Sequence, residues 1–277
     1  MKSLGFNLAR IDGLDWRYAE QNPNVLMPLW EGVAQNADSN GVATIYHFPN
    51  DRNKFPRSIV NQFSTGKDFW EAFWANSITY SGMSIWEAVF QGLWKPLIQT
   101  VDAHPSTLGY GLMNEPIFET ATQLHDYHQF IAQRIRTLTS KVLCFSASGG
   151  GGGGSPQGIA AIAPPKNLGP LVFEGHNYQT TFDPTSEWVA GANLAGAIGV
   201  WYGEFNVKAN GRSVSDPTLI ADIEHFVKPC KKFNIAPTWY SWTSGGRTDL
   251  LNADNTPTGE CQLLSQLYQQ ILGAPTW

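Results

Sequence analysis

Two glutamates in this 277-residue chain stand where apolar, strand-like runs end. Glu115 follows the run Leu108–Met113 and precedes Pro116, and Glu204 lies in the triplet Gly203-Glu204-Phe205. A proline cannot donate to a strand ladder, so pairing should stop at Pro116, and a buried carboxylate is costly unless it is paired or used. Two carboxylates on different strands of one rim suggest hydrolysis of a glycosidic bond, in which one protonates the leaving oxygen and the other attacks the sugar or activates water.

Polar and aromatic residues also end other apolar runs of the sequence. Arg10 and Asp12 close the first run and His47 the second, while His176-Asn177-Tyr178 and the segment 239–242 close two later ones. Catalytic groups of parallel barrels lie at the carboxyl ends of the strands, so these side chains are expected to converge on one rim.

Seven apolar runs alternate with helical patterns and predict a parallel sheet covered on both faces. The predicted strands are Leu4–Ile11, Val42–His47, Leu108–Met113, Val142–Ser146, Leu171–His176, Ile198–Phe205 and Ile235–Trp242. The clearest predicted helices are Gln123–Leu138, Thr218–Phe233, Thr258–Leu272 and a stripe that begins with a Ser84–Glu87 capping box and kinks at Pro96. The length favours one domain, 1–277, folded as a closed α/β (β/α)8 barrel, and a doubly wound sheet is the competing arrangement.

Composition excludes several classes of protein. The net charge is −5 without a basic block, which argues against nucleic acid and anionic membrane surfaces as partners. No apolar run reaches the ~18 residues of a membrane span. A strand pattern begins near Met1, so we expect a secreted protein whose leader has been removed, with a cytoplasmic protein as the alternative. A monomer is expected. Eleven tryptophans are about three times the usual share and suit either stacking on sugar rings or core filling.

No cofactor or metal site is expected from the remaining motifs. Cys144 reads as a buried thiol, whereas Cys230 and Cys261 could pair or stay reduced. His125 and His128 have helical spacing but no further ligand cluster, so structural roles are favoured over a metal site. The glycine run at 149–155 is followed by no Gly-Lys-Ser/Thr, which excludes a phosphate loop and predicts a flexible loop, natural or engineered.

Taken in order, the motifs resemble glycoside hydrolase family 5, the cellulase and endoglucanase family of retaining (β/α)8 barrels. They are Gly5-Phe6-Asn7-x-x-Arg10, Tyr46-His47, Asn114-Glu115-Pro116, His176-x-Tyr178, Gly203-Glu204-Phe205 and Trp242. In the family the arginine lies on the second strand, so the resemblance implies that the first strand is missing or replaced here.

The resemblance also implies roles for these residues. Glu115 would be the acid/base and Glu204 the nucleophile, with Asn114 at the sugar 2-hydroxyl. The other expected substrate-binding or carboxylate-orienting residues are Arg10, His47, His176, Tyr178 and Trp242. We expect burial and the neighbouring carboxylate to raise the pKa of Glu115.

Activity on a β-1,4-glucan is the leading expectation. Mannan, xyloglucan, a glycolipid as in endoglycoceramidases, and a non-catalytic carbohydrate-binding barrel are the alternatives. The aromatic segment 69–82 is expected to wall a cleft, and Glu174, two residues before His176, is expected to be structural and paired with an arginine or a histidine.

Overall fold

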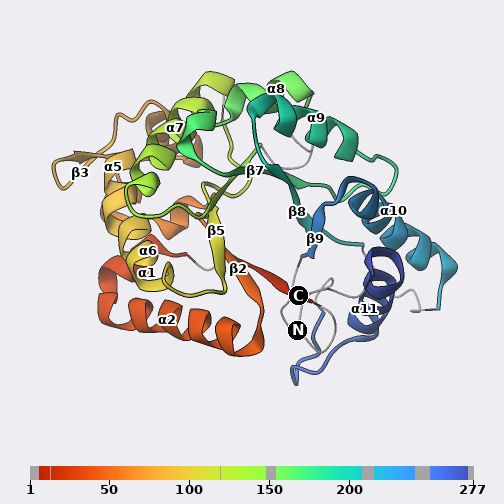
Figure 1. Ribbon diagram of the computed structural model, residues 1–277. Coiled ribbons are helices and arrows are strands. Elements are labelled where there is room, and N and C mark those ends of the chain that lie inside the picture. Colours follow the sequence, from red (N-terminus) through yellow and green to blue (C-terminus); the bar gives the residue numbers. More distant parts are fainter. Residues whose placement is uncertain are drawn as a thin grey trace.

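The computed structural model contains a seven-stranded parallel sheet at the centre of the chain (Figure 1). The structure describes residues 6–12, 14–118, 120–147, 154–207, 215–240 and 250–273. The strands, in spatial order, are β1 (Leu8–Ile11), β2 (Ala43–His47), β5 (Thr107–Gly111), β6 (Val142–Ser146), β7 (Leu171–His176), β8 (Gly199–Phe205) and β9 (Ala236–Trp239). Each lies within or overlaps a predicted run, so the seven strands are confirmed.

The sheet curls into a nearly closed barrel, which confirms the predicted architecture and excludes the doubly wound alternative. Among the described residues no ladder joins β1 to β9, although parts of the two strands approach within 8 Å between Cα atoms. The order starts with the arginine-bearing strand, consistent with a missing first strand.

Helices surround the barrel in Figure 1, and their ring is interrupted between α2 and α11. They are α1 (Trp16–Gln21), α2 (Pro23–Asn40), α3 (Arg57–Val60), α4 (Gly66–Trp74), α5 (Ile85–Val89), α6 (Lys95–Val101), α7 (Ala121–Arg136), α8 (Pro156–Ile162), α9 (Thr185–Ala195), α10 (Pro217–Phe233) and α11 (Gly259–Leu272). A short hairpin of β3 (Thr79–Tyr80) and β4 (Met83–Ser84) precedes α5. No helix in the described ranges is long and apolar enough to cross a membrane.

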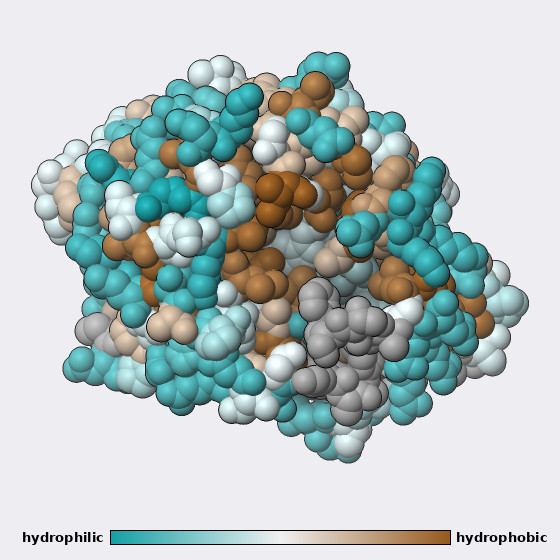
Figure 2. Space-filling view, viewed as in Figure 1, coloured by the Kyte–Doolittle hydropathy of each residue, from teal (hydrophilic) through white to brown (hydrophobic). Residues whose placement is uncertain are grey.

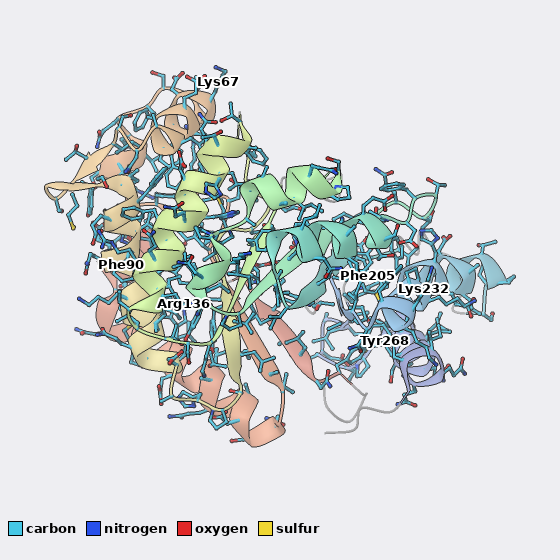
Figure 3. All side chains as sticks on the ribbon, turned by 45° about the horizontal axis from the view of Figure 1, so that its top comes forward. Lys67, Phe90, Arg136, Phe205, Lys232 and Tyr268 are labelled. Carbon is cyan, nitrogen blue, oxygen red and sulfur yellow. The ribbon has the colours of Figure 1, made fainter. Side chains whose placement is uncertain are left out.

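Alternation along the strands separates two apolar regions. Outward-facing residues such as Tyr110 and Phe173 join the helices in one large core, and Phe205 of β8 packs on Phe226 of α10, on the side of the molecule where Figure 3 labels Phe205 and Tyr268. Inward-facing Ile45, Cys144 and Trp201 form a smaller cluster inside the barrel. Hydrophobic residues accordingly gather in the hollowed centre of the face in Figure 2, inside a hydrophilic ring.

The start of α5 differs from the prediction. Ser84 is the N-cap of this helix, but its side chain makes no capping hydrogen bond. The carboxamide of Asn76 accepts from the Trp86 N–H instead, and Glu87 binds Gln91 and Arg134. The predicted interruption near Pro96 is present as a π-helical turn, Phe90–Trp94, just before α6.

The aromatic segment 69–82 packs inward more than it lines a surface. Phe69, Phe73 and Trp74 are buried and contact Phe55 or Tyr127. The expectation of an aromatic cleft wall is therefore wrong for these three residues, because they fill the space between α4 and α7.

The structure shows the state of the three cysteines and the partners of His125 and His128. Cys144, Cys230 and Cys261 are free and buried. His125 and His128 bind the carbonyls of Ala163 and Ile162, and so tie α7 to the end of α8. Residues 149–153 of the glycine run lie outside the described residues.

Candidate active site

Side chains from the ends of β1, β2, β5, β7 and β8 meet at one end of the barrel. They are Arg10, His47, Asn114, Glu115, His176, Tyr178 and Glu204, joined by hydrogen bonds and ion pairs. Seven of the eight predicted site residues are thus brought together, and the eighth, Trp242, lies outside the described residues. Parallel strands explain this convergence, because their carboxyl ends share one rim.

Arg10 is the centre of this network, and all five of its N–H groups have partners. Nε donates to Glu174 (2.7 Å), Nη1 to Glu204 (2.7 Å) and to Asp12, and Nη2 to Asn114 (2.5 Å) and towards His47 Nδ1 (3.3 Å). The guanidinium is almost fully buried. A planar, rigid fork therefore fixes the positions of five groups from five segments of the chain.

His47 lies beneath the carboxylates, with no exposed side-chain surface. Because Arg10 is always a donor, His47 Nδ1 must accept and its proton is assigned to Nε2, which faces Glu174 Oε2 at 3.4 Å. Burial and the charge of Arg10 hold the pKa of His47 well below its usual value, so the ring is neutral. The structure gives His47 orienting contacts and places it away from the surface that a substrate would meet.

Glu204 accepts hydrogen bonds from two donors. Its Oε1 accepts from Arg10 and its Oε2 from the Tyr178 hydroxyl. Burial and the nearby charge of Glu204 raise the pKa of Tyr178, so that hydroxyl keeps its proton and can donate. Only 6 % of the Glu204 side chain is exposed, against 32 % for Glu115.

Glu115 occupies a strained backbone position. Its φ is 38°, in the left-handed region that a glutamate rarely adopts. Two hydrogen bonds hold the turn, from the Asn50 side chain to the Glu115 carbonyl (2.6 Å) and from the Asn114 N–H to the Phe48 carbonyl (2.7 Å). In this conformation the Glu115 side chain reaches His176, whose Nδ1 lies 2.9 Å from Oε1.

The pKa of Glu115 differs from the expectation. The hydrogen bond from His176 lowers it, and burial, which opposes that shift, is incomplete because a third of the side chain is exposed. The predicted rise is therefore wrong for the unliganded site: the neighbour that dominates is a cation, whereas the sequence suggested a carboxylate.

The two glutamates are close together. One ligand atom each of Glu115, His176 and Glu204 lie within 4.8 Å of one another. Such a trio could hold a metal ion, but His176 Nδ1 already faces Glu115 and its Nε2 lies 3.0 Å from Glu174, so the ring is engaged at both nitrogens. The arrangement suits two carboxylates flanking a small reacting group.

Glu174 is fully buried and pairs with Arg10 and His176, as predicted. The Glu174 side chain fits because residue 203 is a glycine: a Cβ there would lie 2.1 Å from Glu174 Oε1. Gly111 leaves space for the His47 ring in the same way. These glycines were missed, as was Asn50. The two glycines could have been found from the sequence, because a glycine inside a strand indicates close approach by another group. No such pattern indicates Asn50.

Asp12 shares the Arg10 Nη1 with Glu204. It is half-exposed at the rim. Burial of its carboxyl raises the pKa to about 6 against the opposing charge of Arg10, and the charge of Glu204 adds to the rise.

Comparison with known proteins identifies the family. A sequence model described as cellulase, glycosyl hydrolase family 5, matches residues 1–246. The chain belongs to glycosyl hydrolase family 5. It is therefore a member of a family of glycoside hydrolases with (β/α)8 barrels. No curated protein sequence matches it significantly.

Solved structures of family 5 enzymes share its fold. Endo-glycoceramidase II from Rhodococcus sp. has a TM-score of 0.71 at 15 % identity, over 94 % of this chain and 70 % of that one. An endoglucanase from Pseudomonas stutzeri has a TM-score of 0.64 at 15 % identity, over 96 % and 82 %. A xyloglucanase from Paenibacillus pabuli has a TM-score of 0.63 at 15 % identity, over 98 % and 88 %.

Proposed function

We propose that this family 5 chain is a retaining endo-β-glycosidase that hydrolyses β-1,4-glucan. The observation that carries the proposal is the separation of its two glutamates: one carboxylate oxygen of Glu115 lies within 4.8 Å of one of Glu204. Retaining glycosidases hold their carboxyl groups about 5–5.5 Å apart, whereas inverting enzymes leave about 6.5–9.5 Å for a water molecule.

In this mechanism Glu204 attacks the anomeric carbon and Glu115 protonates the leaving oxygen. The environments divide the roles. Glu204 is buried and accepts hydrogen bonds from Arg10 and Tyr178, whereas Glu115 is the more exposed carboxyl and bonds to a proton carrier, His176. A glycosyl ester on Glu204 forms as the leaving group departs. Glu115 then takes a proton from the water molecule that hydrolyses the ester.

Asn114 is suited to binding the sugar 2-hydroxyl. Its Oδ1 accepts from Arg10 at 2.5 Å, which fixes the orientation of the carboxamide and leaves Nδ2 to donate. Trp242 is proposed as the platform under the cleaved sugar because large aromatic faces stack on pyranose rings.

A glycolipid is the second candidate substrate. Ile117 lies two residues after Glu115, on the segment that follows the acid, and 60 % of its surface is exposed. The acid contacts the leaving oxygen, so residues next to it lie towards the leaving group, and an exposed isoleucine suits a lipid better than a sugar. One structural relative is named an endo-glycoceramidase.

The test is hydrolysis of a substrate panel by the wild type and by Glu115→Gln, Glu204→Gln and Glu71→Gln. Glu71 is a half-exposed glutamate on α4, paired with Lys67, and serves as the matched control. We expect release of sugar from β-glucan, no measurable release by the Glu204 variant and wild-type activity in the control.

The panel adds mannan, xyloglucan, xylan and detergent-dispersed glycosylceramide, and NMR records the anomer that forms first. Release from glycosylceramide alone would favour the second candidate. A first product of inverted configuration would refute the retaining mechanism, and a folded chain that binds but cleaves nothing would be a carbohydrate-binding barrel.

A further inference from the structure

Glu174 lies directly beneath the two catalytic carboxylates and contacts neither. Its Oε1 accepts from Arg10 Nε (2.7 Å) and His176 Nε2 (3.0 Å), and its side chain has no exposed surface. Gly203 leaves the space that this carboxylate fills. A buried carboxylate is expensive unless it is paired. Here Arg10 and His176 pair with Oε1, and His47 Nε2 lies 3.4 Å from Oε2.

His176 connects Glu174 to Glu115 in a continuous chain. Nδ1 lies 2.9 Å from Glu115 Oε1, and Nε2 lies 3.0 Å from Glu174 Oε1. Ionised carboxylates only accept hydrogen bonds, so both ring nitrogens must carry protons and the ring is an imidazolium. Burial works against this charge, but the hydrogen bonds to Glu115 and Glu174 prevail and raise the pKa of His176 to about 9.

The proton that a general acid needs is therefore stored beside Glu115. The same hydrogen bond lowers the pKa of Glu115, so the carboxylate is ionised and the ring is charged. The pair holds one transferable proton, and the two groups titrate together.

We propose that Glu174 is a positioning residue that keeps a proton on His176 for delivery to the leaving group through Glu115. This inference rests on the proposed role of Glu115 as acid/base. As the glycosidic bond breaks, the proton passes from His176 Nδ1 to Glu115 Oε1, and the Glu115 carboxyl gives a proton to the leaving oxygen. In the second step the attacking water returns a proton to Glu115 and thence to His176.

Glu174 is suited to this task because its charge does not change during the cycle. Besides Glu174, the titratable groups that interact with His176 are Glu115, Glu204 (3.8 Å from Nδ1), Asp12 and His47. Arg10 binds Glu174, Tyr178 binds Glu204, and Cys144 lies in the field of Glu174. Glu204 is neutralised when it becomes an ester, and Glu115 exchanges the proton. Of the carboxylates in contact with His176 among the described residues, Glu174 alone stays ionised throughout.

The first test follows the six histidine rings by NMR as the pH is raised, with His176→Asn used for assignment. We expect His176 to stay protonated to about pH 9 in the wild type. The isosteric change Glu174→Gln removes the charge, and the midpoint of His176 should fall by at least one pH unit. A wild-type midpoint near the ordinary 6.5 would overturn the inference even if the variant fails to fold.

The second test is the pH profile of kcat/KM on aryl β-glycosides with poor and good leaving groups. Glu174→Gln should shift the alkaline limb to lower pH by the same amount as the NMR midpoint, and only for the poor leaving group, because a good one departs without a proton. An unmoved limb, or an equal shift for both substrates, would overturn the inference.

His104, which lies between α6 and β5, provides a matched control. His104 also bonds to two carboxylates, Asp38 at Nδ1 (2.6 Å) and Glu31 at Nε2 (3.2 Å). Glu31→Gln should move the titration of His104 and leave His176 and the kinetic profile unchanged.

The two proposals fail differently. An active wild type whose limb ignores Glu174→Gln refutes this inference alone. A wild type inactive on every substrate, with His176 still protonated at pH 8, refutes the proposed function and with it the delivery step.

Discussion

Replacing Arg10 with lysine should disable and destabilise the protein together. Arginine offers five N–H donors, and all five are used, by Glu174, Glu204, Asp12, Asn114 and His47. Lysine offers three from a single nitrogen, so at least two acceptors lose their donor.

The size of the loss follows from where the acceptors lie. A buried acceptor without a partner costs about 1–3 kcal/mol. Asp12 is 39 % exposed and can be hydrated, so Arg10→Lys should cost at least about 1–3 kcal/mol and up to about twice that if two buried partners are lost. A carboxylate displaced by about 1 Å can lower the rate about 100-fold, and we expect a fall of that order in kcat/KM because Nη1 positions Glu204.

Chemical denaturation and kcat/KM on an aryl β-glycoside measure the two effects. Arg134→Lys is the control, because Arg134 is half-exposed and pairs with Glu87 at the surface, where such pairs contribute about 0–1 kcal/mol. If Arg10→Lys were as stable and as active as Arg134→Lys, the five-way network would not be what holds the site.

Three further predictions address separate features. Asn50→Ala removes the hydrogen bond that holds the strained Glu115 turn. We expect kcat/KM to fall about tenfold and the free energy of unfolding to fall by about 1 kcal/mol. An unchanged kcat/KM would show that the turn does not need this hydrogen bond. Gly111→Ala places a Cβ about 2.0 Å from His47 Cε1 and should cost about 1–3 kcal/mol by overpacking, whereas Gly199→Ala meets nothing within 4 Å and should be neutral in the same denaturation assay. The hydrogen bond to Asp38 raises the pKa of His104 in the folded protein. Its ion pairs with Asp38 and Glu31 therefore stabilise the fold fully below the pKa of the unfolded chain, near 6.5, and this stabilisation is lost as the pH rises through the pKa of the folded protein. His104→Gln should lower Tm more at about pH 5.5 than at about pH 9.5, and an equal fall in Tm at both would refute the ionic origin.

Most of the barrel could be predicted because its strands are short, continuous apolar runs. All seven strands follow from that pattern, and parallel strands then require that Arg10, His47, Glu115, His176 and Glu204 share one rim. Side-chain partners could not be predicted in the same way. Ser84-x-x-Glu87 has the sequence of a capping box, yet Asn76, ten residues before Trp86, supplies the cap through the tertiary fold.

The error over Glu115 has the same origin. The sequence places two carboxylates on one rim, and a carboxylate neighbour raises a pKa. It does not show that His176 lies between them, or that Glu174 beneath makes that histidine a cation. The sign of the shift depends on three residues from two strands, and only the register of the barrel brings them into contact.

The hydrogen-bonded network does not depend on a ladder between β1 and β9, and none joins these strands among the described residues. Every described group of the network comes from β1, β2, β7, β8 or the segment after β5, and Arg10 links the first strand of the sheet to groups on the far side of the barrel. Among the described residues the sheet ends at β1 on one side and at β9 on the other, and no ladder joins these two strands. Arg10 sits on one of those edge strands, so its bonds to Glu174 on β7 and Glu204 on β8 run across the barrel interior and help to hold the open edge in place. The ion pairs that surround Glu204 thus also tie β1 to β7 and β8, and substitutions that weaken them should loosen the attachment of β1.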